Sequence, residues 1–160
     1  MELFIDSADP SDVKASTDLG TVEGITTTPT FMKLMGITDI EGAITELSHL
    51  TNQLHIEALG ETSEDIVAEA ERQAGLPGLG CTVVAKVPIT REGLRATNHL
   101  VSRGFKVNVH LVYTLNQAYV AAAAGASYIC PLVGRLHDQG HDSFELISQI
   151  VEMIDRYGYD

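Results

Sequence analysis

The chain has 160 residues, of which 44% are hydrophobic, so it is long enough for one domain with a substantial core. It carries 22 acidic and only 10 basic side chains, which gives a formal net charge of −12 at pH 7. This excess of negative charge argues against nucleic acid or an anionic membrane as the main partner. Any phosphate in a ligand would have to be held locally, by an arginine or by backbone amides.

Cys81 and Cys130 are the only cysteines, and neither belongs to a CxxC motif. Each lies in an apolar run that is typical of a strand, so we expect buried thiols of a reducing compartment. The first residues, Met-Glu-Leu-Phe-Ile-Asp, lack the basic and long apolar pattern of a signal peptide. No apolar stretch is long enough to cross a membrane. We therefore expect a cytoplasmic protein without a membrane partner, folded as a single domain over residues 1–160.

Short apolar runs predict six strands along the chain, at residues 3–5, 21–25, 53–58, 81–87, 105–113 and 127–133. A polar turn is predicted at residues 26–30. Helical periodicity, capping residues and terminal glycines predict helices at residues 9–20, 31–35, 39–50, 62–74, 90–103, 114–124 and 143–157. Residues 134–142 are polar and are predicted to form a loop.

The alternation of strands and helices predicts parallel strands with covering helices, in a doubly wound sheet or a barrel. In either architecture the chemistry gathers at the carboxyl ends of the strands. The predicted strand ends carry two acids, a lysine, a histidine, an arginine and a run of threonines, at Asp6, Thr26 to Thr28, Glu57, Lys86, His110 and Arg135. This combination favours a site over a random sample of surface residues.

Lys86 is a single cation in the apolar run of residues 82–90. Burying an ammonium group is costly, so a lysine in such a place tends to be paired or deprotonated. A deprotonated lysine is a nucleophile that can form a Schiff base with a carbonyl compound. The alternative is a lysine at a strand end whose ammonium group reaches solvent. The spacing alone leaves both interpretations open.

Several motifs together resemble the small transaldolase and fructose-6-phosphate aldolase family. They are collinear and cover nearly the whole chain: Asp6, Gly24-Ile-Thr-Thr-x-Pro29, Val84-Ala-Lys-Val-Pro-Ile-Thr90 with Glu92-Gly93-Leu94, Asn108-Val-x-Leu-Val112 and Gly134-Arg135-Leu-x-Asp-x-Gly140. The lysine motif and the glycine-arginine motif are the most specific of these.

The resemblance implies a class I aldolase on a (β/α)8 TIM-barrel type of fold, of which this sequence contains about six βα units. It implies that Lys86 forms the Schiff base, that Asp6 and Glu57 transfer protons, and that Arg135 holds a sugar phosphate. Thr26, Thr28, Asn108 and His110 are implied to bind the substrate. No metal or organic cofactor is implied, and the family forms pentamers and decamers, so we expect a homo-oligomer.

The sequence departs from the family pattern at three implied site positions. Thr28 replaces an asparagine, His110 replaces a threonine, and Leu132 replaces an aromatic residue. A histidinium at position 110 would repel a protonated Lys86, whereas a neutral imidazole could accept a proton. Strands 7 and 8 of the family have no counterpart in these 160 residues, which suggests a short natural chain, a fragment or an open sheet. These departures favour an alternative, a catalytically impaired relative that binds a sugar phosphate or assembles.

A second alternative is a metal site made by His137 and His141 with Asp138 and Asp142. The spacing of the histidines suits a metal if the segment is helical. Gly140 lies between them, however, and the segment matches the family's glycine-arginine motif, so we expect a solvated loop. The other histidines, His49, His55 and His99, are expected on surfaces or at strand ends.

Overall fold

The computed structural model describes residues 2–159 and contains six strands and eight helices in that range. In chain order they are β1 (Phe4–Asp6), α1 (Pro10–Thr17), β2 (Gly24–Thr27), α2 (Pro29–Leu34), α3 (Ile40–Ser48), β3 (Gln53–Glu57), α4 (Ser63–Ala74), β4 (Thr82–Pro88), α5 (Arg91–Ser102), β5 (Val107–Val112), α6 (Leu115–Ala123), β6 (Tyr128–Pro131), α7 (Val133–Asp138) and α8 (Ser143–Tyr157). The predicted alternation of strands and helices is therefore confirmed.

The strands lie in the sheet in the order β1-β2-β3-β4-β5-β6, which is also their order along the chain. The pairs β1–β2, β2–β3 and β5–β6 are parallel. A doubly wound sheet reverses its strand order partway, whereas a (β/α) barrel adds each strand beside the previous one. The sheet order thus decides between the two architectures left open by the sequence, in favour of the barrel type with about six units.

The predicted loop at residues 134–142 is wrong for its first half, because α7 occupies Val133–Asp138. No side chain caps the amino end of this helix. Leu136 is its buried residue, and the amides of Gln139 and Gly140 close its last turn on the carbonyl groups of Leu136 and His137. A single buried leucine anchors this short helix, so the sequence shows no apolar period.

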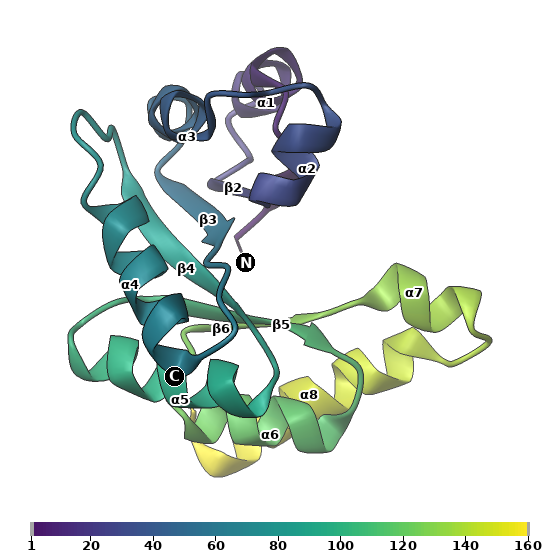
Figure 1. Cartoon of the computed structure of the whole chain (residues 1–160). Helices are drawn as coiled ribbons and strands as arrows, with labels where there is room; N and C mark the ends of the chain where they lie inside the picture. The colour runs from purple at the N-terminus through teal and green to yellow at the C-terminus, as the bar shows by residue number, and fades with distance from the viewer. Residues whose placement is uncertain (1, 160) are drawn as a thin grey trace. The chain divides into compact units, whose positions relative to one another are not determined.

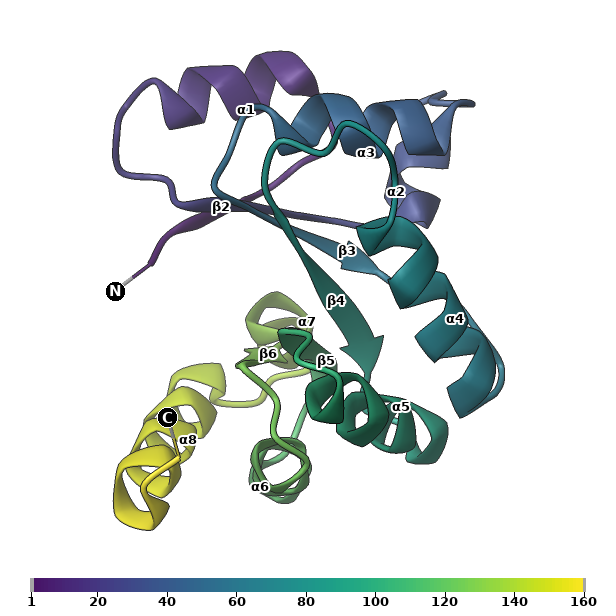
Figure 2. The ribbon, with the colours of Figure 1, turned by 90° about the vertical axis from the view of Figure 1, so that its left-hand side faces the viewer.

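The chain divides into two compact units, one made of residues up to 59 with 68–85, the other of residues 60–67 with those from 86 onward. In the first unit, α1 and α3 lie on one side of β2 and β3 (Figures 1 and 2). Its buried apolar cluster comprises Ala8, Val13, Ile25, Met32, Ile44, Leu47, Leu54, Ile56 and Val83. Alternate residues of β2 and β3 face this core, as expected for strands covered by helices.

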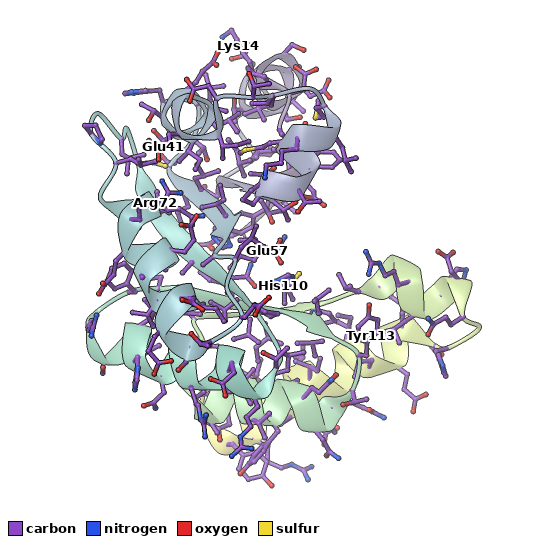
Figure 3. All side chains as sticks on the ribbon, in the orientation of Figure 1. Lys14, Glu41, Glu57, Arg72, His110 and Tyr113 are labelled. Atoms are coloured by element: carbon purple, nitrogen blue, oxygen red, sulfur yellow. The ribbon has the colours of Figure 1, made fainter. Side chains whose placement is uncertain are left out.

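A charged network connects α3 and α4 within the first unit. Arg72 of α4 pairs with Glu69 in its own helix at 2.8 Å and with Glu41 of α3 (Figure 3). Its hydrogen bonds to Glu69 lower the pKa of that carboxyl group. The side chains of the bridge to α3 are 43% and 59% exposed, so this bridge contributes little to the stability of the unit.

In the second unit, α5, α6 and α8 lie on the same side of β5 and β6 (Figures 1 and 2). Ala118 and Ala121 of α6 are fully buried, and such small side chains allow a helix to lie close to a sheet. Thr114 and Gln117 form a capping box at the start of α6. Helix α8 begins at Ser143 and ends at Tyr157, as the sequence predicts.

The packing of α5 on β4 explains the residues that follow the lysine strand. Thr90 caps α5, because its hydroxyl group accepts a hydrogen bond from the Gly93 amide at 2.9 Å. A Cβ atom at Gly93 would collide with the carbonyl oxygen of Pro88. Glycine at this position therefore allows the first turn of α5 to approach the end of β4 closely.

Candidate active site

Lys86 lies in β4, two residues before the strand ends at Pro88. Its side chain is buried, with 8% of its surface exposed. Four other residues of the strand, Val83 to Ala85 and Val87, are also buried. Of the two interpretations that the sequence left open, a buried lysine and one that reaches solvent, the structure favours the buried one.

Strands β4 and β5 are neighbours in the sheet, and a backbone hydrogen bond between their carboxyl ends defines how they align. The Ile89 amide donates to the His110 carbonyl at 3.0 Å. In a parallel ladder this bond places Pro88 opposite His110, and therefore Lys86 opposite Asn108. Residues that are opposite one another point to the same face, as do residues two apart on one strand.

Lys86, Asn108 and His110 consequently share one face of the sheet, and only 8%, 6% and 5% of their surfaces are exposed. We call this the lysine face. The opposite face of β5 carries Val107 and Val109, which are fully buried and apolar. The lysine face differs from it by carrying three buried polar side chains. The structure therefore brings together three residues that the sequence proposed for the site.

The lysine face continues onto β6 with two residues that the sequence prediction missed. Asn108 is the register partner of Tyr128, and His110 is the register partner of Cys130. Both β6 side chains are half-buried. Strand alternation was the available signal, because Tyr128 and Cys130 are two residues apart and so face the same way.

Arg135 lies on α7, which begins two residues after β6 ends. Its side chain is exposed, so the guanidinium group is accessible to a dissolved anion. Leu132, at the position where the family has an aromatic residue, precedes α7 and is half-buried.

The first unit carries a second set of proposed residues at its strand ends. Asp6, the last residue of β1, is the register partner of Thr26, which is in turn the partner of His55. Glu57, the last residue of β3, lies two residues beyond His55 and shares its face. We call this the aspartate face; Asp6 is exposed on it, and Thr26 and Glu57 are half-buried.

His55 is a correction to the sequence prediction, which expected a surface or strand-end position. It lies inside β3 with 1% of its surface exposed. Its ring packs against Phe4 with a centroid distance of 4.6 Å. A Cβ atom at Gly24 would collide with the Phe4 ring, so the glycine of the β2 motif makes room for this aromatic contact.

Thr28 has a structural role that the sequence prediction did not assign to it. It caps α2, and its hydroxyl oxygen accepts a hydrogen bond from the Phe31 amide at 2.9 Å. The remaining hydroxyl proton can still be donated to a ligand. Thr28 therefore offers one donor where an asparagine would offer an amide group with a longer reach.

A hollow of about 460 Å³ lies in the second unit beyond the end of β5. Its lining residues are Tyr113, Thr114, Leu136, Gln139, His141, Asp142, Glu145, Leu146 and Gln149. Tyr113, labelled in Figure 3, follows β5 directly, and its amide donates to Gln117 at 2.8 Å. Lys86 does not line this hollow, so the hollow is separate from the lysine face.

The histidine-rich segment around α7 was the proposed alternative metal site. Within residues 2–159, no three histidine, cysteine, aspartate or glutamate side chains come together as metal ligands.

Within residues 2–159, no helix has both the length and the apolar character that a membrane span requires.

Comparison with known proteins places these residues in context. A family model described as Transaldolase/Fructose-6-phosphate aldolase matches residues 3–160. A "Probable transaldolase" of Streptococcus equi subsp. equi is 40% identical over 160 residues, and one of Streptococcus pyogenes serotype M1 is 41% identical. Each match covers 99% of this chain and 73% of the relative.

A solved structure from Coccidioides immitis, of a protein named provisionally as a fructose-1,6-biphosphate aldolase, has a similar fold. The TM-score is 0.57 at 19% identity, over 94% of this chain and 60% of that one. At this identity the likeness concerns the fold alone.

Proposed function

Since this chain belongs to the transaldolase and fructose-6-phosphate aldolase family, we propose that it is a class I aldolase in which Lys86 forms a Schiff base with a ketose or ketose phosphate. The observation that carries the proposal is the buried Lys86 on β4, with Asn108 and His110 on the same face of the sheet. A lysine amine condenses with a carbonyl group, and the family resemblance implies the nucleophile at this position.

In the proposed reaction, the neutral Lys86 amine attacks the ketose carbonyl carbon to form a carbinolamine, which loses water to become an iminium ion. The iminium ion withdraws electrons, so the neighbouring carbon–carbon bond can break and leave an enamine on the lysine. One product is an aldehyde. The enamine, a bound dihydroxyacetone unit, then either adds to an acceptor aldehyde or takes up a proton and is hydrolysed.

Two carboxyl groups are proposed to move the protons that this sequence requires. Asp6 takes the proton of the sugar hydroxyl group as the carbon–carbon bond breaks, and returns it in the reverse direction. Glu57 serves the carbinolamine and iminium steps through a water molecule. Two carboxyl groups can divide such roles when their burial differs, and Asp6 is exposed whereas Glu57 is half-buried.

The substrate is proposed to be held by polar groups and by one arginine. The exposed guanidinium group of Arg135 offers a bidentate fork to a sugar phosphate. Thr26, Thr28, Asn108 and His110 are proposed to bind the sugar hydroxyl groups. No metal or organic cofactor enters the proposal, and the cytoplasmic location and single domain stay predictions.

One observation favours the alternative of a family member that binds a sugar phosphate without turnover. The Thr28 hydroxyl group already accepts the Phe31 amide, so its proton and one lone pair remain for a substrate. Weaker binding of the ketose by Thr28 would lower turnover more than it lowers phosphate binding by Arg135. Binding without a covalent adduct would support this alternative.

The test is to incubate the protein with fructose 6-phosphate or dihydroxyacetone, add borohydride, and measure the intact mass. We expect a permanent mass gain, because borohydride reduces an iminium ion to a stable amine. The mass gain is expected to fall at least about 100-fold in Lys86→Met, because methionine has no amine that could form the iminium ion at this position. Lys106→Met removes an exposed lysine just before β5 and is the matched control, expected to keep the adduct.

Absence of an adduct across a panel of ketoses would contradict the proposed reaction, as would an adduct that persists in Lys86→Met.

The family resemblance also implies a pentamer or a decamer. Light scattering, compared with the 17.2 kDa mass of one chain, tests the expected homo-oligomer separately.

A further inference from the structure

Leu111 has an unusual backbone conformation in the strand that carries Asn108 and His110. Its φ angle is 62°, and every other residue with a positive φ within residues 2–159 is a glycine. A leucine in this left-handed region brings its Cβ atom too close to the following carbonyl oxygen. A residue kept in such a conformation is a sign that the surrounding structure needs it there.

The conformation of Leu111 coincides with a β-bulge between β5 and β6. His110 pairs with Cys130, but Val112 pairs with Pro131, so the pairing advances two residues on β5 and only one on β6. Cys130 and Pro131 are consecutive and therefore point to opposite faces. Their partners must do the same, so His110 and Val112 face opposite ways although they are two residues apart.

The bulge thereby changes which side chains occupy the lysine face. In a regular strand Val112 would follow His110 on that face. In the structure Val112 points with Val109 to the other face, and both are fully buried. Val112 therefore does not follow His110 on the lysine face.

We propose that Leu111 is a positioning residue that turns Val112 away from the lysine face, so that the longer chain of a ketose bound to Lys86 can extend beyond His110. The inference rests on the proposed function, because it assumes a ketose at Lys86. The class of ligand is a polyhydroxy ketone with more than three carbons. A three-carbon ketone ends near the lysine and does not need this space.

Three variants test the proposal. Leu111→Gly keeps the left-handed conformation, because glycine adopts a positive φ without strain. Leu111→Ile has the same number of atoms but a β-branched side chain that resists this conformation. Deletion of Leu111 removes the bulge but makes Val112 the residue directly after His110, so regular alternation keeps Val112 off the lysine face.

The readout compares a long and a short ketose in the same variant, by titration calorimetry and by borohydride trapping. In Leu111→Ile we expect binding of fructose 6-phosphate to weaken by about tenfold or more relative to binding of dihydroxyacetone. Leu111→Gly and the deletion are expected to bind both like the unmodified protein, because Val112 stays on the opposite face in each. A purely structural role would weaken both ligands alike, and thermal unfolding of each variant shows whether it is folded.

The outcomes separate this inference from the proposed function. If fructose 6-phosphate binds without an adduct, the Schiff base is refuted while the ratio between the two ligands still tests Leu111. If the adduct forms and all Leu111 variants keep the same ratio, the role of Leu111 is refuted and the function stands. If the unmodified protein binds no ketose, both are refuted. If the deletion does not fold, the comparison of Leu111→Ile with Leu111→Gly decides.

Discussion

Cys81, the residue before β4, shows at the scale of one side chain how burial controls chemistry. It is a free thiol, packed against the apolar cluster of the first unit. Burial raises the pKa of this thiol from 9.0 to about 11, because a thiolate would lose its hydration there. Cys81 is therefore expected to be inert at neutral pH, since the thiolate is the reactive form.

We expect iodoacetamide to modify Cys81 at pH 8 about 100-fold more slowly in the folded chain than in the urea-unfolded chain, because its pKa is about two units higher when folded. The folded chain also keeps this proton to higher pH than the unfolded chain does. The contribution of Cys81 to stability is thus complete below pH 9 and is lost as the pH rises toward about 11.

Peptide mass spectrometry resolves Cys81 from Cys130 and gives both rates in one experiment. The variant Cys81→Ser is the control for the stability measurement, because it should lose less stability over the same alkaline range. Equal alkylation rates in the folded and unfolded chains would show that the thiol is not protected.

Individual site residues differed in how well the sequence could predict them. The place of Lys86 in a strand follows from its apolar neighbours, and its place near the strand end follows from Pro88, whereas its burial was left open by the sequence. The bulge at Leu111 could not be predicted, because positive φ is usually signalled by glycine or asparagine and neither is present. The burial of His55 was missed because it depends on a contact with Phe4, which is distant in the sequence.

At the scale of elements, the contact between α5 and β4 gives a test of close packing. We expect Gly93→Ala to lower the free energy of unfolding by about 1–3 kcal/mol, because the new Cβ atom would collide with the Pro88 carbonyl. The higher helix propensity of alanine offsets part of this loss, by at most about 1 kcal/mol. Urea denaturation measures the difference.

Gly134 in α7 provides the matched control for this substitution. A Cβ atom there would have no neighbour within 4 Å, so Gly134→Ala should be neutral or stabilising. If the two glycine variants changed stability by the same amount, the collision at Pro88 would not be the cause.

The elements themselves were predicted unevenly, for a physical reason. Helix α8 has a long apolar face, with Leu146, Ile150 and Met153 buried, so its period is visible in the sequence. Helix α7 has six residues, contains a glycine and buries only Leu136, so composition favoured a loop. Its formation depends on packing of one side chain and on backbone capping, which local sequence does not encode.

At the scale of the whole molecule, the strong negative charge affects stability. With a net charge of −12, the folded chain concentrates like charges that the unfolded chain can separate. We expect the melting temperature to rise by about 2–4 °C when sodium chloride is raised from about 20 mM to about 200 mM, because the salt screens this repulsion. Differential scanning calorimetry measures the shift.

Choline chloride is the control, because screening depends on ionic strength and should be similar for both salts. A rise with sodium alone would indicate specific ion binding. An unchanged or lower melting temperature in both salts would show that self-repulsion does not limit stability.

The architecture as a whole illustrates what strand periodicity leaves open. Doubly wound sheets and barrels both alternate strands with helices, so the apolar runs were compatible with either. The distinction lies in which strands are neighbours, and that is set by helix packing across the sheet. Only the observed order β1-β2-β3-β4-β5-β6 decided it.

The same strand order has a consequence for synthesis on the ribosome. Strands that are consecutive along the chain are hydrogen-bonded to one another. Such pairings join segments that are close in sequence, so the loop closed at each step is short and the entropy lost is small. Each strand can therefore pair as soon as the next one leaves the exit tunnel, and the sheet can grow in the direction of translation.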